Sequence, residues 1–114
     1  MKILINIFFL LFVSNAIAQN NSIKTVTFTV SGACGDCKER IENAADIKGV
    51  KKCTWNKDSK VATLIFDEKK VSQDKVEQAI AKAGYATEHI KADEKAYKKL
   101  PDCCQYNEPE NKTH

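Results

Sequence analysis

The stretch IKTVTFTVSGACGDCKERIENAADI, residues 23–47, changes its hydrophobic period halfway along. Within residues 23–30, Val26, Phe28 and Val30 alternate with three threonines, which predicts a half-buried strand. From about residue 36 to 47 the apolar residues recur at helical spacing instead. The inward face of this expected helix is formed by Cys37, Ile41, Ala44 and Ala45. The stretch therefore predicts a strand, a glycine-rich loop with a cysteine, and a helix.

The segments that follow complete an alternating order of strands and helices. Two strands are predicted at residues 50–55 and 60–66, joined by a polar turn. Ser72 is a suitable N-cap for a second helix that Gly84 ends, and residues 85–90 form a short fourth strand. With right-handed crossovers this order predicts an α+β, ferredoxin-like βαββαβ open-faced sandwich. Both helices would lie on one face of an antiparallel four-stranded sheet.

The first eighteen residues are predicted to be a signal peptide. Lys2 gives a short positive start, residues 3–13 are almost wholly apolar, and residues 16–18 (Ala-Ile-Ala) match the pattern that a signal peptidase cleaves. The apolar run is shorter than the ~20 residues that span a bilayer. We therefore expect export to the periplasm and no membrane span after cleavage. The predicted divisions are a signal peptide (1–18), a linker (19–22), a domain (23–90) and a tail (91–114).

The charge of the mature chain indicates no nucleic-acid partner. Of the 18 Lys and Arg residues only Lys2 lies in the signal, so 17 remain against 15 Asp and Glu, a net charge of +2. Both signs are interspersed, as at residues 38–40 and 67–70. Such a pattern is typical of a solvated surface and not of a basic binding patch.

The five cysteines of the sequence all lie in the mature chain. They are Cys34, Cys37, Cys53, Cys103 and Cys104. An odd number leaves at least one thiol without an intramolecular disulfide partner, and the two tight clusters are more typical of chelating groups than of a disulfide framework. A plain disulfide between Cys34 and Cys37 is the alternative, although it would close a loop too small to stabilise the fold much. The only methionine is Met1, so the mature chain offers no thioether ligand.

Three features together resemble the heavy-metal-associated domain. They are the loop at residues 32–37 (Gly-Ala-Cys-Gly-Asp-Cys), the order of the elements, and residues 83–85 (Ala-Gly-Tyr) before the last strand. This module occurs in copper chaperones, in the N-terminal domains of metal pumps and in the periplasmic mercury-binding protein. The resemblance covers residues 23–90 and implies that Cys34 and Cys37 bind the metal.

The loop departs from the family motif, which usually reads Gly-Met-x-Cys-x-x-Cys. Aligned on the cysteines, Ser31 stands where the glycine would be and Gly32 where the methionine would be. The family's methionine packs beneath the loop and is not a ligand. Its absence bears on the rigidity of the loop and not on the coordination.

The placement of the two cysteines suits a soft metal ion. Cys37 is expected in the first turn of a helix, where free N–H groups and the positive dipole end favour a thiolate. Cys34 is expected on the loop between two glycines, which permit unusual backbone angles. Two thiolates favour Cu(I) or Hg(II) over hard ions, whereas a structural Zn(II) would want four ligands. An exposed two-thiol site also suits a carrier, because the thiols of a partner can bind the ion before the first two thiols dissociate from it.

The sequence indicates the identity of the metal and of the partner less directly than it indicates the two binding cysteines. The export signal resembles that of the periplasmic mercury-binding protein, while Tyr85 after Ala83 and Gly84 resembles bacterial copper chaperones. We expect the bound ion to be Cu(I), because cells need copper more commonly than they meet mercury. Hg(II) is the alternative, and Zn(II) is expected less than either. The expected partner is a metal-transporting membrane protein or another thiol-bearing carrier. Tyr85 has two interpretations, an outer-shell role beside the metal loop or simple capping of the sheet.

Two other functions remain open. A thiol–disulfide oxidoreductase would use Cys34 and Cys37, but the thioredoxin fold carries a proline beside its active cysteines, and here the only prolines are Pro101 and Pro109. A sensor or docking module would use the tail as its interaction surface. We expect a binding protein and not an enzyme. Cys53 and Trp55 are expected in the core, and His89 on the surface.

The tail cysteines invite a separate hypothesis. A disulfide between Cys103 and Cys104 would be strained, since adjacent Cα atoms are about 3.8 Å apart across a trans peptide, below the usual disulfide range. Residues 93–100 can form a short helix whose apolar side docks the tail on the domain. We hypothesise that one tail thiolate then reaches the ion as a third ligand. The alternative is that the pair bridges to other molecules or has no role.

Overall fold

The computed structural model describes residues 22–107. The strands are β1 (Ile23–Thr29), β2 (Val50–Trp55) and β3 (Val61–Asp67), and the helices are α2 (Gly35–Ala45), α3 (Gln73–Lys82), α4 (Glu94–Lys98) and the 3₁₀ helix η1 (Asp102–Cys104). The expected signal peptide and most of the linker lie outside the described residues. Within the described range, no helix is long and apolar enough to cross a membrane.

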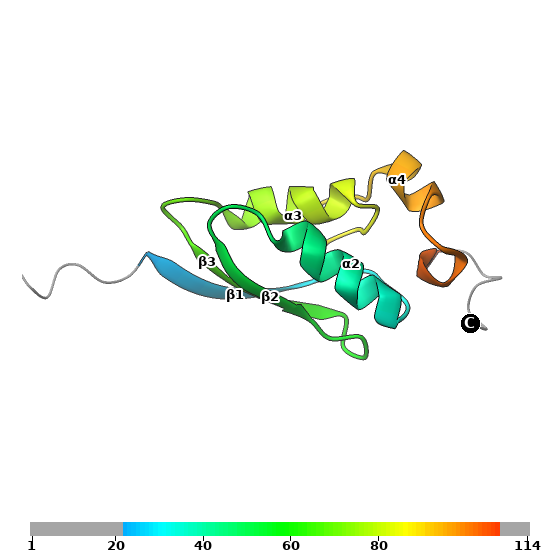
Figure 1. Cartoon of the computed structure of the whole chain (residues 1–114), viewed down its shortest axis with the longest axis horizontal. Helices are drawn as coiled ribbons and strands as arrows, with labels where there is room; N and C mark the ends of the chain where they lie inside the picture. Colours follow the sequence, from blue (N-terminus) through cyan, green and yellow to red (C-terminus); the bar gives the residue numbers. More distant parts are fainter. Residues whose placement is uncertain (1–21, 108–114) are drawn as a thin grey trace, which may run out of the picture.

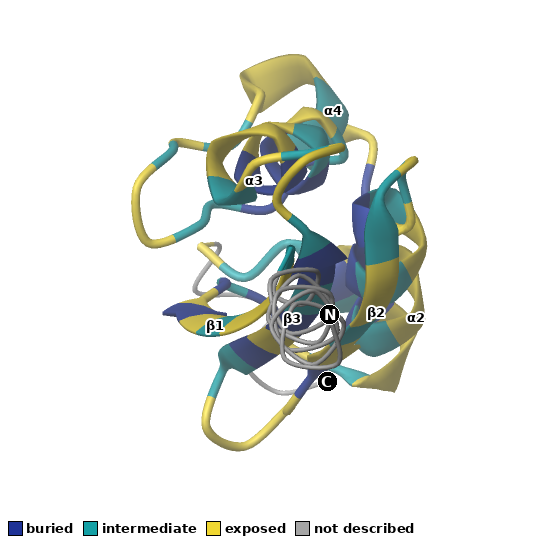
Figure 2. Ribbon diagram, turned by 90° about the vertical axis from the view of Figure 1, so that its left-hand side faces the viewer, coloured by how far each residue is buried: buried dark blue, intermediate teal, exposed yellow. Residues whose placement is uncertain are grey.

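The sheet and its two long helices form the two layers that the sequence predicts. β3 is the middle strand and runs antiparallel to both neighbours, in the order β1-β3-β2. α2 and α3 contact each other and lie on one face of the sheet (Figure 1). Figure 2 shows the same layers along the sheet, with buried segments between them. The largest fully buried side chains of this core are Trp55, Tyr85, Phe28, Ile41, Leu64 and Ile80.

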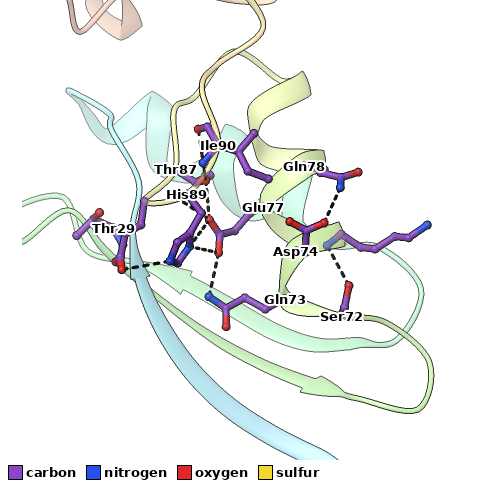
Figure 3. A network of polar contacts seen from close by, with 11 residues as sticks. Thr29, Ser72, Gln73, Asp74, Glu77, Gln78, Thr87, His89 and Ile90 are labelled. Atoms are coloured by element: carbon purple, nitrogen blue, oxygen red, sulfur yellow. Dashed lines mark hydrogen bonds and ion pairs between the residues drawn. The ribbon is translucent and has the colours of Figure 1, made fainter.

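The predicted fourth strand at residues 85–90 is wrong, because the described chain forms only a single β-bridge there, through Thr87. The Thr87 N–H donates to the Ile90 carbonyl oxygen at 2.8 Å, so the segment turns back instead of continuing beside β1. The buried carboxylate of Glu77 supports this turn, accepting hydrogen bonds from the Thr87 hydroxyl at 2.6 Å and from the ring of His89 (Figure 3). His89 itself is exposed, as predicted.

The short helix expected after residue 92 is present as α4. The Asp93 carboxylate caps it by accepting a hydrogen bond from the Ala96 N–H at 2.9 Å. α4 approaches the end of α3 closely at Gly84, whose φ is +106°. A Cβ on Gly84 would lie 3.0 Å from backbone atoms of Ala96 and of Tyr97. Gly84 therefore ends α3 and also leaves room for the segment that carries the tail.

Candidate metal centre

The Cys-x-x-Cys pair lies at the start of α2, where the sequence predicts it. Cys34 is the N-cap residue with an extended backbone, and its side chain makes no capping hydrogen bond. The Cys37 N–H donates to the Cys34 carbonyl oxygen at 3.0 Å, which closes the first turn. The two sulfurs are 3.5 Å apart, and both thiols are free. Cys37 is fully buried, whereas Cys34 is half-buried at the mouth of the site.

The indole of Trp55 supports this loop from beneath. A Cβ on Gly32 would lie 2.7 Å and 2.8 Å from two carbons of the Trp55 ring. The ring is fixed in turn, because its Nε1 donates to the Val30 carbonyl oxygen at 3.0 Å. Trp55 is in the core, as predicted, and it fills the space beneath the loop in a chain without the family's methionine.

The tail is attached to the domain mainly through Tyr106. Its hydroxyl donates to the Gly84 carbonyl oxygen and accepts from the Ala86 N–H, each at 2.9 Å. Its ring stacks on Tyr85 with a centroid distance of 6.1 Å and meets Tyr97 edge-on at 4.9 Å. These contacts span the junction between the domain and the tail, so the tail packs as part of the fold.

This docking brings both tail thiols to the Cys-x-x-Cys pair. The sulfur of Cys34 lies 3.1 Å from that of Cys103 and 3.5 Å from that of Cys104. The sulfurs of Cys34, Cys37 and Cys104 all lie within 4.8 Å of one another. Cys103 forms a second group of this kind with Cys34 and a carboxylate oxygen of Asp36. The docking expected from the sequence therefore places four thiols together.

Tyr85 lies against this cluster and not only at the edge of the sheet. Its ring is fully buried, and its hydroxyl has no hydrogen-bond partner of ordinary geometry among the described residues. Burial, and then the neighbouring sulfurs of Cys104 and Cys37, raise the pKa of Tyr85 well above its usual range. The hydroxyl therefore stays protonated and is available to donate a hydrogen bond to a thiolate.

The thiols differ in how readily they ionise. Burial acts to raise the pKa of Cys34, but hydrogen bonding with Cys103, with the Cys37 backbone and with the thiols of Cys104 and Cys37 outweighs it and lowers this pKa to about 7. The hydrogen bond to Cys34 raises the pKa of Cys103, and burial raises the pKa of Cys104. Cys34 is thus more readily ionised near neutral pH than either tail thiol.

Cys53 and His89 lie apart from the centre. Cys53 is half-buried on β2, and burial and then the Glu42 charge raise its pKa to about 11. His89 pairs with Glu77 at 2.9 Å. Tyr106 and Asp36 could not be singled out from the sequence, because their importance depends on where the tail docks.

Comparisons with known proteins give one family. The family model described as "Heavy-metal-associated domain" matches residues 27–86. The CopZ metallochaperone is 29% identical over 56% of this chain and 98% of its own, with a TM-score of 0.54. Oxidised MerP from Ralstonia metallidurans CH34 is 33% identical over 57% of this chain and 93% of its own, with a TM-score of 0.54.

A third solved structure is the N-terminal domain of a potential copper-translocating P-type ATPase from Bacillus subtilis in the Cu(I)-loaded state. It is 26% identical over 58% of this chain and 85% of its own, with a TM-score of 0.55. Sequence comparison with curated proteins finds no match. These matches cover the domain, whereas the family model ends before the tail that carries Cys103 and Cys104.

Proposed function

Because the chain belongs to the heavy-metal-associated domain family, we propose that it is an exported protein that binds Cu(I) through Cys34 and Cys37. The observation that carries this proposal is the pair of free sulfurs 3.5 Å apart at the start of α2. Thiolates are the ligands that soft ions prefer, and Cys34, with a pKa of about 7, offers one near neutral pH. The bound ion is cargo that the protein transfers or sequesters.

Copper is the first choice of ion and mercury the second. Of the three solved structures described above, one is the CopZ metallochaperone and one is the Cu(I)-loaded domain of a potential copper-translocating ATPase. MerP, the third, has the highest identity of these three, and its likeness favours Hg(II) as the alternative cargo. Both ions accept two thiolates, so the coordination proposed here is the same for either.

Binding and not catalysis fits the surroundings of the thiols. An oxidoreductase of the thioredoxin type carries a proline beside its cysteines, whereas Pro101 and Pro109 are the only prolines of this sequence. The antiparallel sheet β1-β3-β2 also differs from the parallel units of that fold. A metal-transporting membrane protein or another thiol-bearing carrier is the expected recipient of the ion.

The experiment is native mass spectrometry of the reduced protein, titrated separately with Cu(I), Hg(II) and Zn(II). We expect one soft ion to bind tightly, and Cys34→Ser or Cys37→Ser to remove the high-affinity binding, because a serine hydroxyl is a poor ligand for a soft ion. Cys53→Ser is the matched control and should bind like the parent. Binding as tight as that of the parent in both site variants would place the site elsewhere.

Export is tested on the same protein without a metal. The first eighteen residues support the proposal through their charged start, apolar run and Ala-Ile-Ala motif. Expression in a Gram-negative host should give a periplasmic form whose intact mass begins at Gln19. Recovery of uncleaved protein in the cytoplasm alone would contradict export.

A further inference from the structure

We propose that Cys104 is the third protein ligand of the bound ion, so that Cys34, Cys37 and Cys104 form a three-thiolate site that the tail closes. This inference rests on the proposed function, since it adds a ligand to the same ion. The ligand class is a soft d¹⁰ ion that accepts three thiolates, for which Cu(I) is the probe. A plain two-thiol carrier would leave the same ion open to solvent on one side.

The three sulfurs are already close to the spacing of such a site. Cys34 is 3.5 Å from Cys37 and 3.5 Å from Cys104, and all three sulfurs lie within 4.8 Å of one another. Metal–thiolate bonds of about 2.3 Å place the three sulfurs of a trigonal site roughly 4 Å apart. An ion therefore needs only small outward shifts of the side chains, and no movement of the tail.

Cys104 and not Cys103 has the position of a ligand. Cys104 is fully buried beside Cys37, on the inner side of the cluster. Cys103 is on the outer side, 3.1 Å from the Cys34 sulfur and 3.9 Å from a carboxylate oxygen of Asp36. The two neighbours on one short helix thus provide a natural comparison of an inner and an outer thiol.

The tail also has contacts that do not involve its thiols. The Cys104 N–H donates to the Pro101 carbonyl oxygen at 2.8 Å inside η1. The hydroxyl of Tyr106 makes two hydrogen bonds to the domain, and the Gln105 side chain donates to the Leu100 carbonyl oxygen at 3.1 Å. A third ligand that is already positioned costs little entropy when the ion binds.

Tyr85 gives a second, independent indication. Its buried hydroxyl lies beside the sulfurs of Cys37 and Cys104 and has no ordinary hydrogen-bond partner among the described residues. An unpaired buried hydroxyl is costly. A thiolate at Cys104 or Cys37 would supply its acceptor, as outer-shell donors do at metal sites. A buried cysteine acting only as a small apolar residue would leave this hydroxyl unpaired.

The test compares the adjacent variants Cys104→Ser and Cys103→Ser in the full protein, loaded with one equivalent of Cu(I). A phosphine reductant avoids added thiols, and native mass spectrometry confirms a monomer, so every sulfur on copper comes from one chain. X-ray absorption then counts sulfurs. We expect three in the parent and in Cys103→Ser, and two in Cys104→Ser. A competing Cu(I) chelator should show Cys104→Ser at least roughly tenfold weaker, as even outer-shell losses cost about 10–100-fold.

Two sulfurs in the parent, or three in Cys104→Ser, would overturn the inference. The parent count does not depend on the folding of any variant, and Cys104→Ala, checked by circular dichroism, repeats the comparison without a hydroxyl. The two proposals fail differently. A parent that binds Cu(I) through two sulfurs, lost in Cys34→Ser, contradicts only the tail ligand. A parent that binds no soft ion contradicts the proposed function itself.

Discussion

At the scale of single residues, Gly32 and Trp55 act as a matched pair. The Trp55 ring occupies the space where any side chain on Gly32 would lie, with ring carbons at 2.7 Å and 2.8 Å from its Cβ position. Because the indole Nε1 is bonded to the Val30 carbonyl, the ring cannot move away freely. The Cys-x-x-Cys loop thus has its support from a residue on β2, some twenty positions along the chain.

Gly32→Ala should therefore lower the free energy of unfolding by about 1–3 kcal/mol, the usual cost of overpacking a core. Urea denaturation of the apo protein measures this loss. Gly35→Ala is the control, because a Cβ on Gly35 meets no atom within 4 Å. Equal stability of the two variants would show that Trp55 does not support the loop.

The thiols of Cys34 and Cys53 should react with an alkylating reagent at very different rates. Their pKa values are about 7 and about 11, lowered in Cys34 by neighbouring thiol hydrogen bonds that outweigh its burial, and raised in Cys53 by burial and the Glu42 charge. Near pH 8 the thiolate fraction of Cys34 is roughly a thousand times that of Cys53. The thiolate of Cys34 is the weaker nucleophile because its pKa is lower, so the expected difference in reaction rate is smaller, at least about tenfold. Iodoacetamide labelling followed by mass spectrometry measures both rates.

The pH profile of this labelling gives a second criterion. The rate at Cys34 should rise through about pH 7 and level off, while the rate at Cys53 should still be rising above pH 9. A faster reaction at Cys53 would contradict its half-buried position.

Cys53→Ala should cost on the order of 1 kcal/mol of stability through lost packing and leave the metal stoichiometry unchanged.

At the scale of elements, periodicity predicts the main strands and helices but not the fate of residues 85–90. Three strands and two long helices appear within one or two residues of their predicted bounds. Alternation in the sequence reports which residues are apolar, and not where backbone hydrogen bonds go. The Ala86 N–H bonds to the Tyr106 hydroxyl, and the Thr87 N–H bonds within its own turn. Tyr106 lies twenty residues further along the chain, and the turn is supported by the carboxylate of Glu77, so neither arrangement can be predicted from the local pattern.

The turn at residues 87–90 should make the stability of the domain depend on pH. The pKa of Glu77 is lowered, because hydrogen bonds from Thr87, His89 and Gln73 outweigh the burial that would raise it. The pKa of His89 is raised by the hydrogen bond and charge of Glu77, with smaller contributions from two exposed acidic residues, Glu88 and Asp74. The pair is therefore fully formed when the carboxylate is charged and the imidazole protonated.

The direction of the pH dependence of stability follows from the pKa shifts of Glu77 and His89. The Glu77 contribution is present above its unfolded pKa of 4.5 and is lost as the pH falls through the lower folded value. The His89 contribution is present below its unfolded pKa of 6.5 and is lost as the pH rises through the higher folded value. His89→Gln should thus destabilise the protein near pH 5.5 and much less near pH 8.5. Urea midpoints that differ equally at both pH values would contradict the ion pair.

At the scale of the whole molecule, the proposed metal site joins parts of the chain that are seventy residues apart. The sequence predicts Cys34 and Cys37 from a local motif, because both lie at one strand–helix junction. It supplies only a hypothesis for Cys103 and Cys104, since their position depends on Gly84, Tyr85 and Tyr106 packing together. The family model ends at residue 86, so the comparisons do not extend to the tail either.

If Cys104 binds the ion, the bound ion must also stabilise the docked position of the tail. Binding free energies are reciprocal, so the factor by which the docked tail tightens Cu(I) binding equals the factor by which Cu(I) favours docking. The backbone N–H groups of Cys104, Gln105 and Tyr106 all donate within the docked tail, and they exchange with solvent when it opens. Hydrogen exchange at these amides therefore reports tail opening directly.

Saturating Cu(I) should slow exchange of these three amides by the same factor, at least roughly tenfold, by which Cys104→Ser weakens Cu(I) binding. Exchange followed by mass spectrometry, with and without Cu(I), measures the change in the parent. Cys104→Ser is the control, because it still binds the ion through Cys34 and Cys37 but should leave tail exchange unchanged. Equal slowing in the parent and in this variant would mean that the ion stabilises the domain as a whole and that the tail closes independently of it.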